Sequence, residues 1–353
     1  MSESRQLSER NRNVLKALIQ EHVRTGRPVG SRTLSKIYSE GVSAATLRNV
    51  MGDLEDSGYL MQPHTSAGRV PTQEGYRFYV QSMLEATEVS AREVERIRKD
   101  LAEESDLDEL MNKTSRLLSF YTDSVGFVLS PRLTVTAVKH IEFLKLSGRR
   151  LLVILVSSTG IVQHRFLGLD ETFSQAELDQ ASRYLVENFA GQSLLEIRER
   201  LLQLQSQEKA LYDRILRSVI LLLSAGVFQD EQGPVDESEV FLGGTARVLQ
   251  KLDGMTLDHL VALLETFERK GKLVRLINEC IRDEERSPAI RIGLDDHLPE
   301  MVNWSLVSSI YRCDQQPLGS LGILGPSRME YDRAVGLVRC VANVFGQILS
   351  ERS

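Results

Sequence analysis

Residues 28–77 read PVGSRTLSKIYSEGVSAATLRNVMGDLEDSGYLMQPHTSAGRVPTQEGYR. Hydroxyl-bearing caps and glycines divide this stretch into two short helical patterns, followed by a Gly- and Pro-bounded segment that predicts two strands joined by a turn. Upstream, residues 8–24 repeat apolar side chains at helical spacing until Thr25-Gly26-Arg27-Pro28 ends the pattern. Three helices and a hairpin in this order are typical of a winged helix-turn-helix, so we expect residues 1–79 to form a DNA-binding domain.

The third of these helices is expected to lie in the major groove. Ser31 is predicted to cap a helix over residues 32–39, and Ser43 to cap the third helix. An apolar stripe of the third helix faces inward, so the other side chains of its first two turns face outward. Among these, Arg48 suits guanine or phosphate and Asn49 suits adenine. The alternative is a merely solvated face. The predicted DNA contacts in this part are Ser31, Arg32, Ser43, Ala45, Thr46, Arg48 and Asn49.

The hairpin is expected to be the wing. Strands are predicted at residues 59–62 and 68–70, with a polar turn between them. Hydroxyls and an arginine on a protruding hairpin suit phosphate and minor-groove contact. His64 could equally be a structural turn residue. The predicted wing contacts are His64, Thr65, Ser66 and Arg69.

Several blocks of this sequence resemble the HrcA-type heat-inducible transcription repressors of bacteria. Val70 and Leu47 stand where that family often has isoleucine, and both are volume-conserving exchanges. The blocks that carry the resemblance are Pro28-Val29-Gly30-Ser31, Ser43-Ala44-Ala45-Thr46-Leu47-Arg48-Asn49, Asp53-Leu54-Glu55, residues 62–72, Gly75-Tyr76-Arg77 and residues 321–331.

The resemblance implies a function and a set of partners. It implies a homodimer that binds an inverted-repeat operator in double-stranded DNA, represses chaperone operons, is relieved by heat stress and is modulated by a GroEL-type chaperonin. It further implies that the β-rich region is GAF-like and that a helical insertion within it helps dimerisation.

The remainder of the chain predicts an α+β multidomain protein. Residues 80–120 are helical and charge-rich and are expected to be a connector, although such runs are often only solvated spacers. Alternating and continuous apolar runs predict strands over residues 125–166 and again over 290–324. A leucine-rich helix at Ile215–Val227 suits burial against a partner or within one chain. The expected domains are 121–191 with 286–353 as the GAF-like domain, and 192–285 as the inserted helical dimerisation segment.

Charge is distributed unevenly along the chain. The net charge is −6, yet residues 1–80 carry 11 Lys and Arg against 8 Asp and Glu, a net +3, which leaves −9 for the rest. A mildly basic DNA-binding domain followed by an acidic remainder of the chain favours site-specific binding over non-specific attraction to DNA. Three dispersed cysteines, no apolar signal core and no long apolar run predict a reduced, cytoplasmic protein without a membrane segment.

We expect no enzymatic function, cofactor or metal. The six histidines are dispersed, and neither a Cys-x-x-Cys, a His-Glu-x-x-His nor a glycine-rich phosphate motif occurs. Asp295-Asp296 and Asp283-Glu284-Glu285 are typical of solvent-facing turns rather than of a metal site. Two alternatives to a plain repressor remain: a regulator that senses a small molecule through the GAF-like domain, and an interaction protein whose winged domain binds protein.

Overall fold

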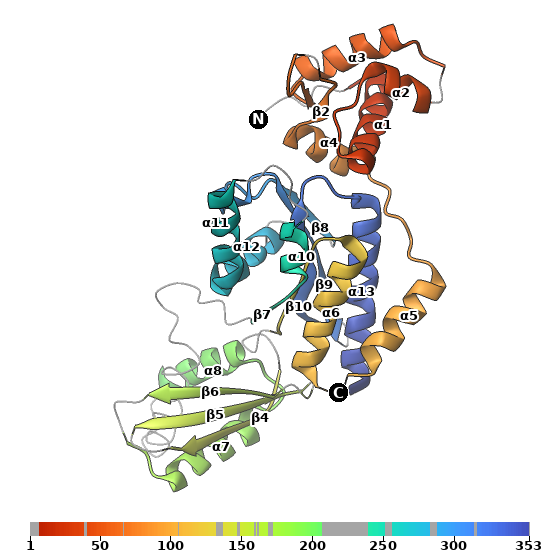
Figure 1. The fold of residues 1–353 in the computed structure, drawn as a ribbon. Helices are drawn as coiled ribbons and strands as arrows, with labels where there is room; N and C mark the ends of the chain where they lie inside the picture. The colour runs from red at the N-terminus through yellow and green to blue at the C-terminus, as the bar shows by residue number, and fades with distance from the viewer. Residues whose placement is uncertain are drawn as a thin grey trace.

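The computed structural model describes residues 7–38, 41–65, 67–104, 106–131, 137–146, 149–158, 160, 162–168, 172–206, 239–250, 256–282, 288–313 and 316–352. These residues form a mixed α/β arrangement with three separate sheets, in agreement with the predicted α+β class. Figure 1 shows an N-terminal unit at the top, a central body below it and a smaller module at the bottom. No helix in the described part of the chain is long and apolar enough to cross a membrane.

The N-terminal unit, residues 7–83, packs helices around one apolar core. The first helix is capped by Ser8 and ends at Gly26, whose φ of 70° is a left-handed conformation that glycine adopts readily. The two strands pair antiparallel and form a two-stranded sheet. The elements are α1 (Glu9–Thr25), α2 (Ser31–Ile37), α3 (Ala44–Asp56), β1 (Leu60–Met61), β2 (Val70–Pro71) and α4 (Gln73–Met83).

The central body is built on a five-stranded antiparallel sheet in the order β7-β3-β10-β9-β8. Alternating side chains point to opposite faces, so Val128 and Val307 meet one core while Phe127 and Leu306 meet another. The strands are β3 (Val125–Leu129), β7 (Val240–Gly243), β8 (Ala289–Ile292), β9 (Trp304–Cys313) and β10 (Gln316–Pro326).

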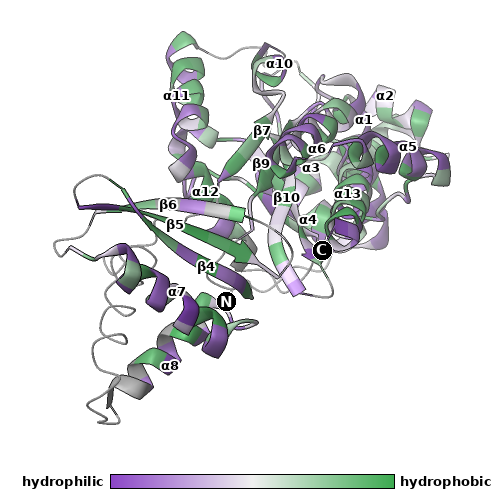
Figure 2. Cartoon of the chain, turned by 90° about the horizontal axis from the view of Figure 1, so that it is seen from below, coloured by the Kyte–Doolittle hydropathy of each residue, from purple (hydrophilic) through white to green (hydrophobic). Residues whose placement is uncertain are grey.

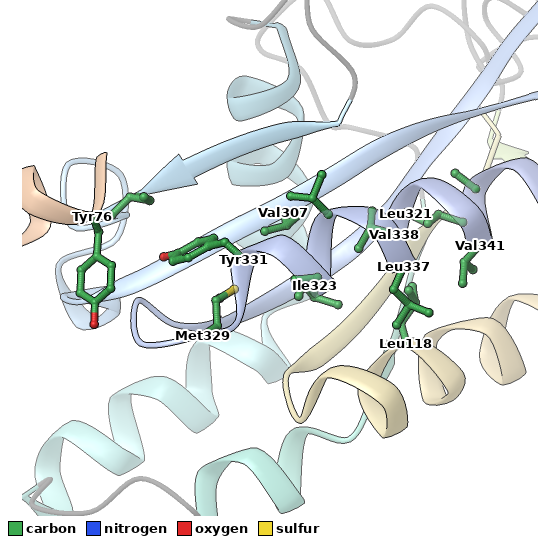
Figure 3. Close-up of a cluster of buried hydrophobic side chains, with 14 of the residues drawn as sticks. Tyr76, Leu118, Val307, Leu321, Ile323, Met329, Tyr331, Leu337, Val338 and Val341 are labelled. Atoms are coloured by element: carbon green, nitrogen blue, oxygen red, sulfur yellow. The ribbon is translucent and has the colours of Figure 1, made fainter. Parts of the chain in front are cut away.

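Helices cover both faces of this sheet. On one face α6 and α13 pack against the strands, and α5 packs on α13. Figure 3 shows Leu118 of α6 and Leu337, Val338 and Val341 of α13 gathered near Ile323 of the sheet. On the other face lie α10, α11 and α12. The helices are α5 (Ala91–Ala102), α6 (Leu107–Thr122), α10 (Thr245–Gln250), α11 (Leu257–Glu268), α12 (Lys270–Arg282) and α13 (Tyr331–Arg352), with a short 3-10 helix at Pro299–Met301.

A separate module follows β3 in the chain. Among the described residues its three strands pair with one another and with no other strand, in the order β4-β5-β6. They share a core with α7 and α8 that is distinct from the core of the body. We call residues 137–206 the inserted module, because the chain leaves the five-stranded sheet after β3 and returns to it at β7. Its elements are β4 (Val138–Lys145), β5 (Arg150–Ser157), β6 (Val162–Gly168), α7 (Gln175–Phe189) and α8 (Leu194–Ser206).

This arrangement differs from the predicted division of the chain. Residues 138–168 were expected in one sheet with the C-terminal strands, but they form a sheet of their own. The segment 192–285 was expected to be almost wholly helical, yet it contains β7, an edge strand of the body. Strand periodicity shows which face of a strand is buried but not which other strand it pairs with, because pairing depends on contacts distant in sequence. The predicted helix Ile215–Val227 lies outside the described residues.

The expected helical connector, residues 80–120, also divides differently. Residues 84–90 are not helical, and they join α4 to α5. Helix α6 packs on the central sheet, where a Cβ on Gly126 or on Gly243 would overlap the backbone carbonyl of Ser115. The charged residues of 80–120 therefore belong to a short extended linker and to helices of the body, rather than to a free spacer.

The N-terminal unit is docked on the body through α4. The rings of Tyr76 and Tyr331 lie 6.1 Å apart between centroids, and Figure 3 shows them side by side at this junction. Arg77 Nε donates a hydrogen bond of 3.0 Å to the carbonyl of Ile292 in β8. Two sequence blocks that lie more than 200 residues apart are thereby brought together.

Candidate nucleic-acid interface

Helix α3 presents the face that its sequence predicts. Its N-cap, Ser43, accepts a hydrogen bond of 3.2 Å from the backbone N–H of Thr46. The apolar stripe is buried, and Ala45, Arg48 and Asn49 are exposed, so the predicted phase of this helix is confirmed. The buried stripe consists of Leu47, Val50, Met51 and Leu54. Figure 1 places α3 at the end of the molecule away from the inserted module.

Gly52 belongs to the same outward face and was missed in the sequence. It follows Arg48 by four residues and Asn49 by three, so all three lie on one side of the helix. Nothing lies within 4 Å of the position that a Cβ on Gly52 would take. A glycine inside a helix costs about 0.5–1 kcal/mol relative to alanine, but here it leaves a smooth surface that another molecule can approach closely. Its spacing from Arg48 is the signal that identifies it.

The cap of α3 limits what two predicted contact residues can do. The hydroxyls of Ser43 and Thr46 lie 3.0 Å apart, and the Ser43 hydroxyl also serves the first turn of the helix. Thr46 is half-buried. Both residues hold the start of the helix in place, which leaves Arg48 and Asn49 as the long polar side chains of this face.

The start of α2 differs from the prediction. The N-cap is Gly30, which makes no side-chain cap, and Ser31 is the first residue of the helix. Ser31 is only 9% exposed, so its hydroxyl presents little surface to a partner. The cap was misplaced by one residue because a serine after a glycine satisfies the cap pattern at either position. Arg32, the next residue, is exposed as expected.

The wing is ordered by a glutamine. Gln62 Nε2 donates to the carbonyls of Thr65 and Ala67 at 3.0 and 2.9 Å, and the N–H of Ala67 donates to the carbonyl of His64 at 2.8 Å. His64 and Thr65 are exposed at this turn. Ser66, the third predicted residue of the wing, lies outside the described residues. A side chain that fixes its own loop keeps His64 and Thr65 in a defined position.

Arg69, the fourth predicted wing residue, is engaged within the unit. Its guanidinium lies 2.7 Å from Glu55 of α3, and both side chains are largely shielded from solvent. Its backbone forms two hydrogen bonds of 2.9 Å with Val29. At neighbouring Gly68 a Cβ would overlap the backbone of Val29, so only glycine fits this approach. Arg69 therefore fixes the wing against α3 and against the segment that precedes α2, a role that sequence spacing did not reveal.

Charge along α3 is graded. The N-terminal half carries Arg48, next to the partly positive end of the helix, and exposed Arg32 and Lys36 lie on α2, which packs against it. The C-terminal half carries exposed Asp53 and Asp56. A polyanion is therefore favoured at the N-terminal half of α3 and disfavoured at its other end.

The described residues show no metal site beside this surface. No group of three or more His, Cys, Asp or Glu side chains is arranged among them to bind a metal ion. Cys280 and Cys313 are buried, and Cys340 is partly buried. The arrangement at α3 and the wing can bind and position a ligand by charge and hydrogen bonding.

Comparison with known proteins shows which family this chain resembles. A family model described as the HrcA protein C-terminal domain matches residues 108–335. Proteins named heat-inducible transcription repressor HrcA are similar over nearly the full length. The one from Syntrophobacter fumaroxidans is 40% identical over 346 residues, 98% of both chains. The one from Geobacter sulfurreducens is 40% identical over 344 residues, 97% of this chain and 98% of the relative. A third, from Xanthomonas axonopodis, is 37% identical over 347 residues, 98% of this chain and 97% of the relative.

One solved structure shares the fold. The crystal structure of a hypothetical protein matches 99% of this chain and 100% of its own length, with a TM-score of 0.57 and 20% sequence identity. At that identity the likeness concerns the fold alone.

Proposed function

This chain belongs to the HrcA family of heat-inducible transcription repressors, a family of regulators rather than enzymes, and on that premise we propose that it represses transcription by binding an inverted-repeat operator in double-stranded DNA. The N-terminal unit acts as a winged helix-turn-helix. The observation that carries the proposal is the outward face of α3, where exposed Ala45, Arg48 and Asn49 adjoin the smooth surface at Gly52.

Each residue of this face has a distinct role in the proposal. Arg48 donates to guanine or to a phosphate, and Asn49 pairs with adenine through its amide. Ala45 and Gly52 keep the helix close to the base edges because they are small. Arg32 binds backbone phosphate. His64 and Thr65 contact phosphate from the wing, and the sequence predicts the same contact for Ser66. Arg69 positions the wing through Glu55.

A gel-shift titration at fixed salt tests DNA binding. Inverted-repeat operator DNA is compared with scrambled DNA, using the full chain and a variant with Arg48→Ala and Asn49→Ala. Because each specific side-chain–base pair contributes about 1–3 kcal/mol, the double variant is expected to lose on the order of a hundredfold in operator affinity. Arg92→Ala, which removes an exposed cation from α5, is the matched control. Equal, weak binding to both DNAs favours the alternative that this unit binds protein.

We further propose that the protein acts as a homodimer, because a palindromic operator requires two reading units related by a two-fold axis. The inserted module supports this idea. Helices α7 and α8 cover one face of its sheet and form a core with it, as Figure 2 shows from below. On the other face Val162 is 62% and Phe166 is 66% exposed, next to half-buried Leu152 and Val156 of β5. An apolar sheet face of this kind favours association with a second copy.

Sedimentation of matched variants tests the dimer. Val162→Asp with Phe166→Asp places two charges on the apolar face and is expected to shift the protein to monomer. Phe120→Asp is the control, since Phe120 is also 66% exposed but lies on α6 of the body. A double variant that stays dimeric at the concentrations where the unaltered chain is dimeric contradicts the assignment of this face.

Three finer points complete the proposal and rest on family membership. Repression is relieved by heat stress, a GroEL-type chaperonin modulates the active form, and the central sheet is GAF-like. The protein works in the cytoplasm, where its operator is. Operator binding measured across heat-shock temperatures, with and without added chaperonin, separates a direct effect of heat on the fold from an effect of chaperonin supply.

A second function, regulation by a small molecule, is favoured by one observation. A cavity of about 440 Å³ lies at the junction between the N-terminal unit and the body, rather than inside the central sheet. Pockets of roughly 300–1,000 Å³ at domain junctions are common sites for small ligands.

A further inference from the structure

Five segments line the cavity at the junction. They are α1 and Tyr79 of α4 from the N-terminal unit, linker residues 87–89, Glu93 of α5, and the first turns of α13 with the residues just before it. The cavity volume is about 440 Å³. The linker is fixed there, because the N–H of Thr87 donates a hydrogen bond of 2.9 Å to the carbonyl of Asp332. A ligand in this cavity would touch the N-terminal unit, the linker and the body at once.

Part of the cavity wall is apolar. Ile19 and Val23 contribute from α1, and Met329 and Leu337 contribute from the body. Ile19, Met329 and Leu337 belong to the buried core that the N-terminal unit and the body share. This wall suits the hydrocarbon part of a ligand, because contact with it removes apolar surface from water.

Another part of the wall is acidic. Glu88 and Glu330 are exposed and form no ion pair with a described residue, and Asp332 is half-buried. The Asp332 carboxylate accepts a hydrogen bond from the Tyr79 hydroxyl, at 3.1 and 3.0 Å from its two oxygens. This neutral hydroxyl donor compensates the negative charge of the carboxylate only in part.

The two arginines that line the cavity are already paired. Arg24 binds Glu21 through two hydrogen bonds of 2.9 and 2.7 Å. Arg333 lies 3.7 Å from Glu93. These pairs neutralise the two arginines that line the cavity, so the acidic part of the wall gives it an excess of negative charge.

We propose that this cavity binds a small organic amine, whose ammonium group lies between Asp332 and Glu330 and whose hydrocarbon part packs on Ile19, Val23 and Leu337. A carboxylate or phosphate ligand is disfavoured because it would add like charge beside these acids. A neutral ligand would gain the apolar contact but not the charge-assisted hydrogen bonds.

The titration of Asp332 agrees with this chemistry. Burial raises the pKa of Asp332 above its ordinary value, while the Tyr79 hydrogen bond and Lys16 lower it and Glu85 and Glu330 raise it again. A carboxylate that is costly to ionise in the empty cavity is stabilised by an ammonium ion placed against it.

Occupancy of the cavity should affect how the N-terminal unit is positioned. Because the cavity exists only while α1 and α13 are docked, a ligand that fills it stabilises the docked arrangement over any other. That consequence for operator affinity rests on the proposed repressor function. The binding itself does not, so it is measured without DNA.

Calorimetric titration of the full chain tests the proposal. The probes are phenethylamine, the neutral 2-phenylethanol and the anionic 3-phenylpropionate. Phenethylamine is expected to bind saturably and about tenfold or more tightly than 2-phenylethanol, since hydrogen bonds to charged groups contribute about 1.5–3 kcal/mol. The anion is expected to bind most weakly.

Variants then locate the site. Asp332→Asn is expected to weaken phenethylamine binding about tenfold, and Glu330→Gln, on an exposed residue, to weaken it less. Val89→Trp fills the cavity from the linker and should abolish binding of the amine and the alcohol alike. Glu95→Gln on the exposed side of α5 is the control and should change nothing. Equal affinities for amine and alcohol, no saturable binding of either, or amine binding that Val89→Trp leaves intact would overturn the proposal.

Discussion

The hydroxyl of Tyr79 in α4 lies 3.1 and 3.0 Å from the two carboxylate oxygens of Asp332 at the start of α13. The backbone carbonyl of Asp332 also accepts a hydrogen bond from Thr87 in the linker. One residue of the body is therefore joined to the N-terminal unit through its side chain and to the linker through its backbone. This relationship helps to hold the N-terminal unit and the linker against the body.

Tyr79→Phe should loosen the junction. The change removes the hydroxyl and leaves a half-buried carboxylate without its donor, so the free energy of unfolding is expected to fall by about 1 kcal/mol. Cleavage of the linker at residues 84–90 by a dilute protease should become faster. Chemical denaturation and timed proteolysis measure the two effects.

Tyr121→Phe provides the comparison for that variant. The Tyr121 hydroxyl on α6 makes no hydrogen bond with the described residues, so its loss should leave both measurements unchanged. Equal proteolysis rates in the two variants would show that the Tyr79 hydroxyl does not help to hold the N-terminal unit in place.

Stability should depend on pH through Asp332. Burial, the largest cause, raises the pKa of this carboxyl above its ordinary value of 3.8. The folded state then retains the proton to higher pH than the unfolded state does, so the contribution of Asp332 to stability is present below pH 3.8 and is lost as pH rises through the folded pKa.

The difference between two unfolding curves isolates this contribution. Asp332→Asn cannot ionise, so the free energy of unfolding of the unaltered chain minus that of the variant should fall as pH rises from 3.8. Urea unfolding at a series of pH values measures it. A difference that rises with pH would mean that Lys16 and Tyr79 outweigh the burial of the carboxyl.

Gly52→Leu should separate stability from operator binding. Replacing a mid-helix glycine whose Cβ would meet open space is expected to stabilise α3 by about 0.5–1 kcal/mol. The new side chain projects from the same face as Arg48 and Asn49, so operator affinity should fall roughly tenfold, the equivalent of one lost base contact. Thermal unfolding and gel shift report the two quantities.

Gly271→Leu in α12 is the matched control for this change. Gly271 is also helical, and the position of its Cβ is equally open. It should not affect DNA binding. If Gly52→Leu keeps full operator affinity, the face of α3 that contains Gly52 does not approach the DNA.

Gly68→Ala should destabilise the N-terminal unit. A Cβ at this position would overlap the backbone of Val29, so the wing must shift away from α2 at a cost of about 1–3 kcal/mol. Gly30→Ala lies on the opposing segment, where a Cβ meets nothing within 4 Å, so it should cost only the N-cap preference for glycine over alanine, about 0.5–1 kcal/mol. Denaturant midpoints of the two variants measured side by side decide whether this approach is as tight as the structure shows.

Much of the N-terminal unit could be predicted because its helices and turns are specified by residues that are close together in the sequence. The apolar stripe of α3 repeats at helical spacing, so the amino-acid pattern was enough to assign Arg48 and Asn49 to the outer face. Ser31 and Arg69 were assigned less well. Whether a polar side chain is free depends on what packs over it, and Arg69 is engaged by Glu55 and Val29, which are far from it in sequence.

Sequence by itself determined most of the helices and strands, the phase of α3, the family and the concentration of positive charge in the first 80 residues, because these follow from neighbouring residues and from motifs that are short. Only the tertiary structure decided that residues 138–168 form their own sheet, that β7 returns to the central sheet and that Tyr79 contacts Asp332 beside a cavity. These features depend on contacts between residues up to 253 positions apart. Hydrophobic periodicity indicates that a surface is buried but does not specify its partner.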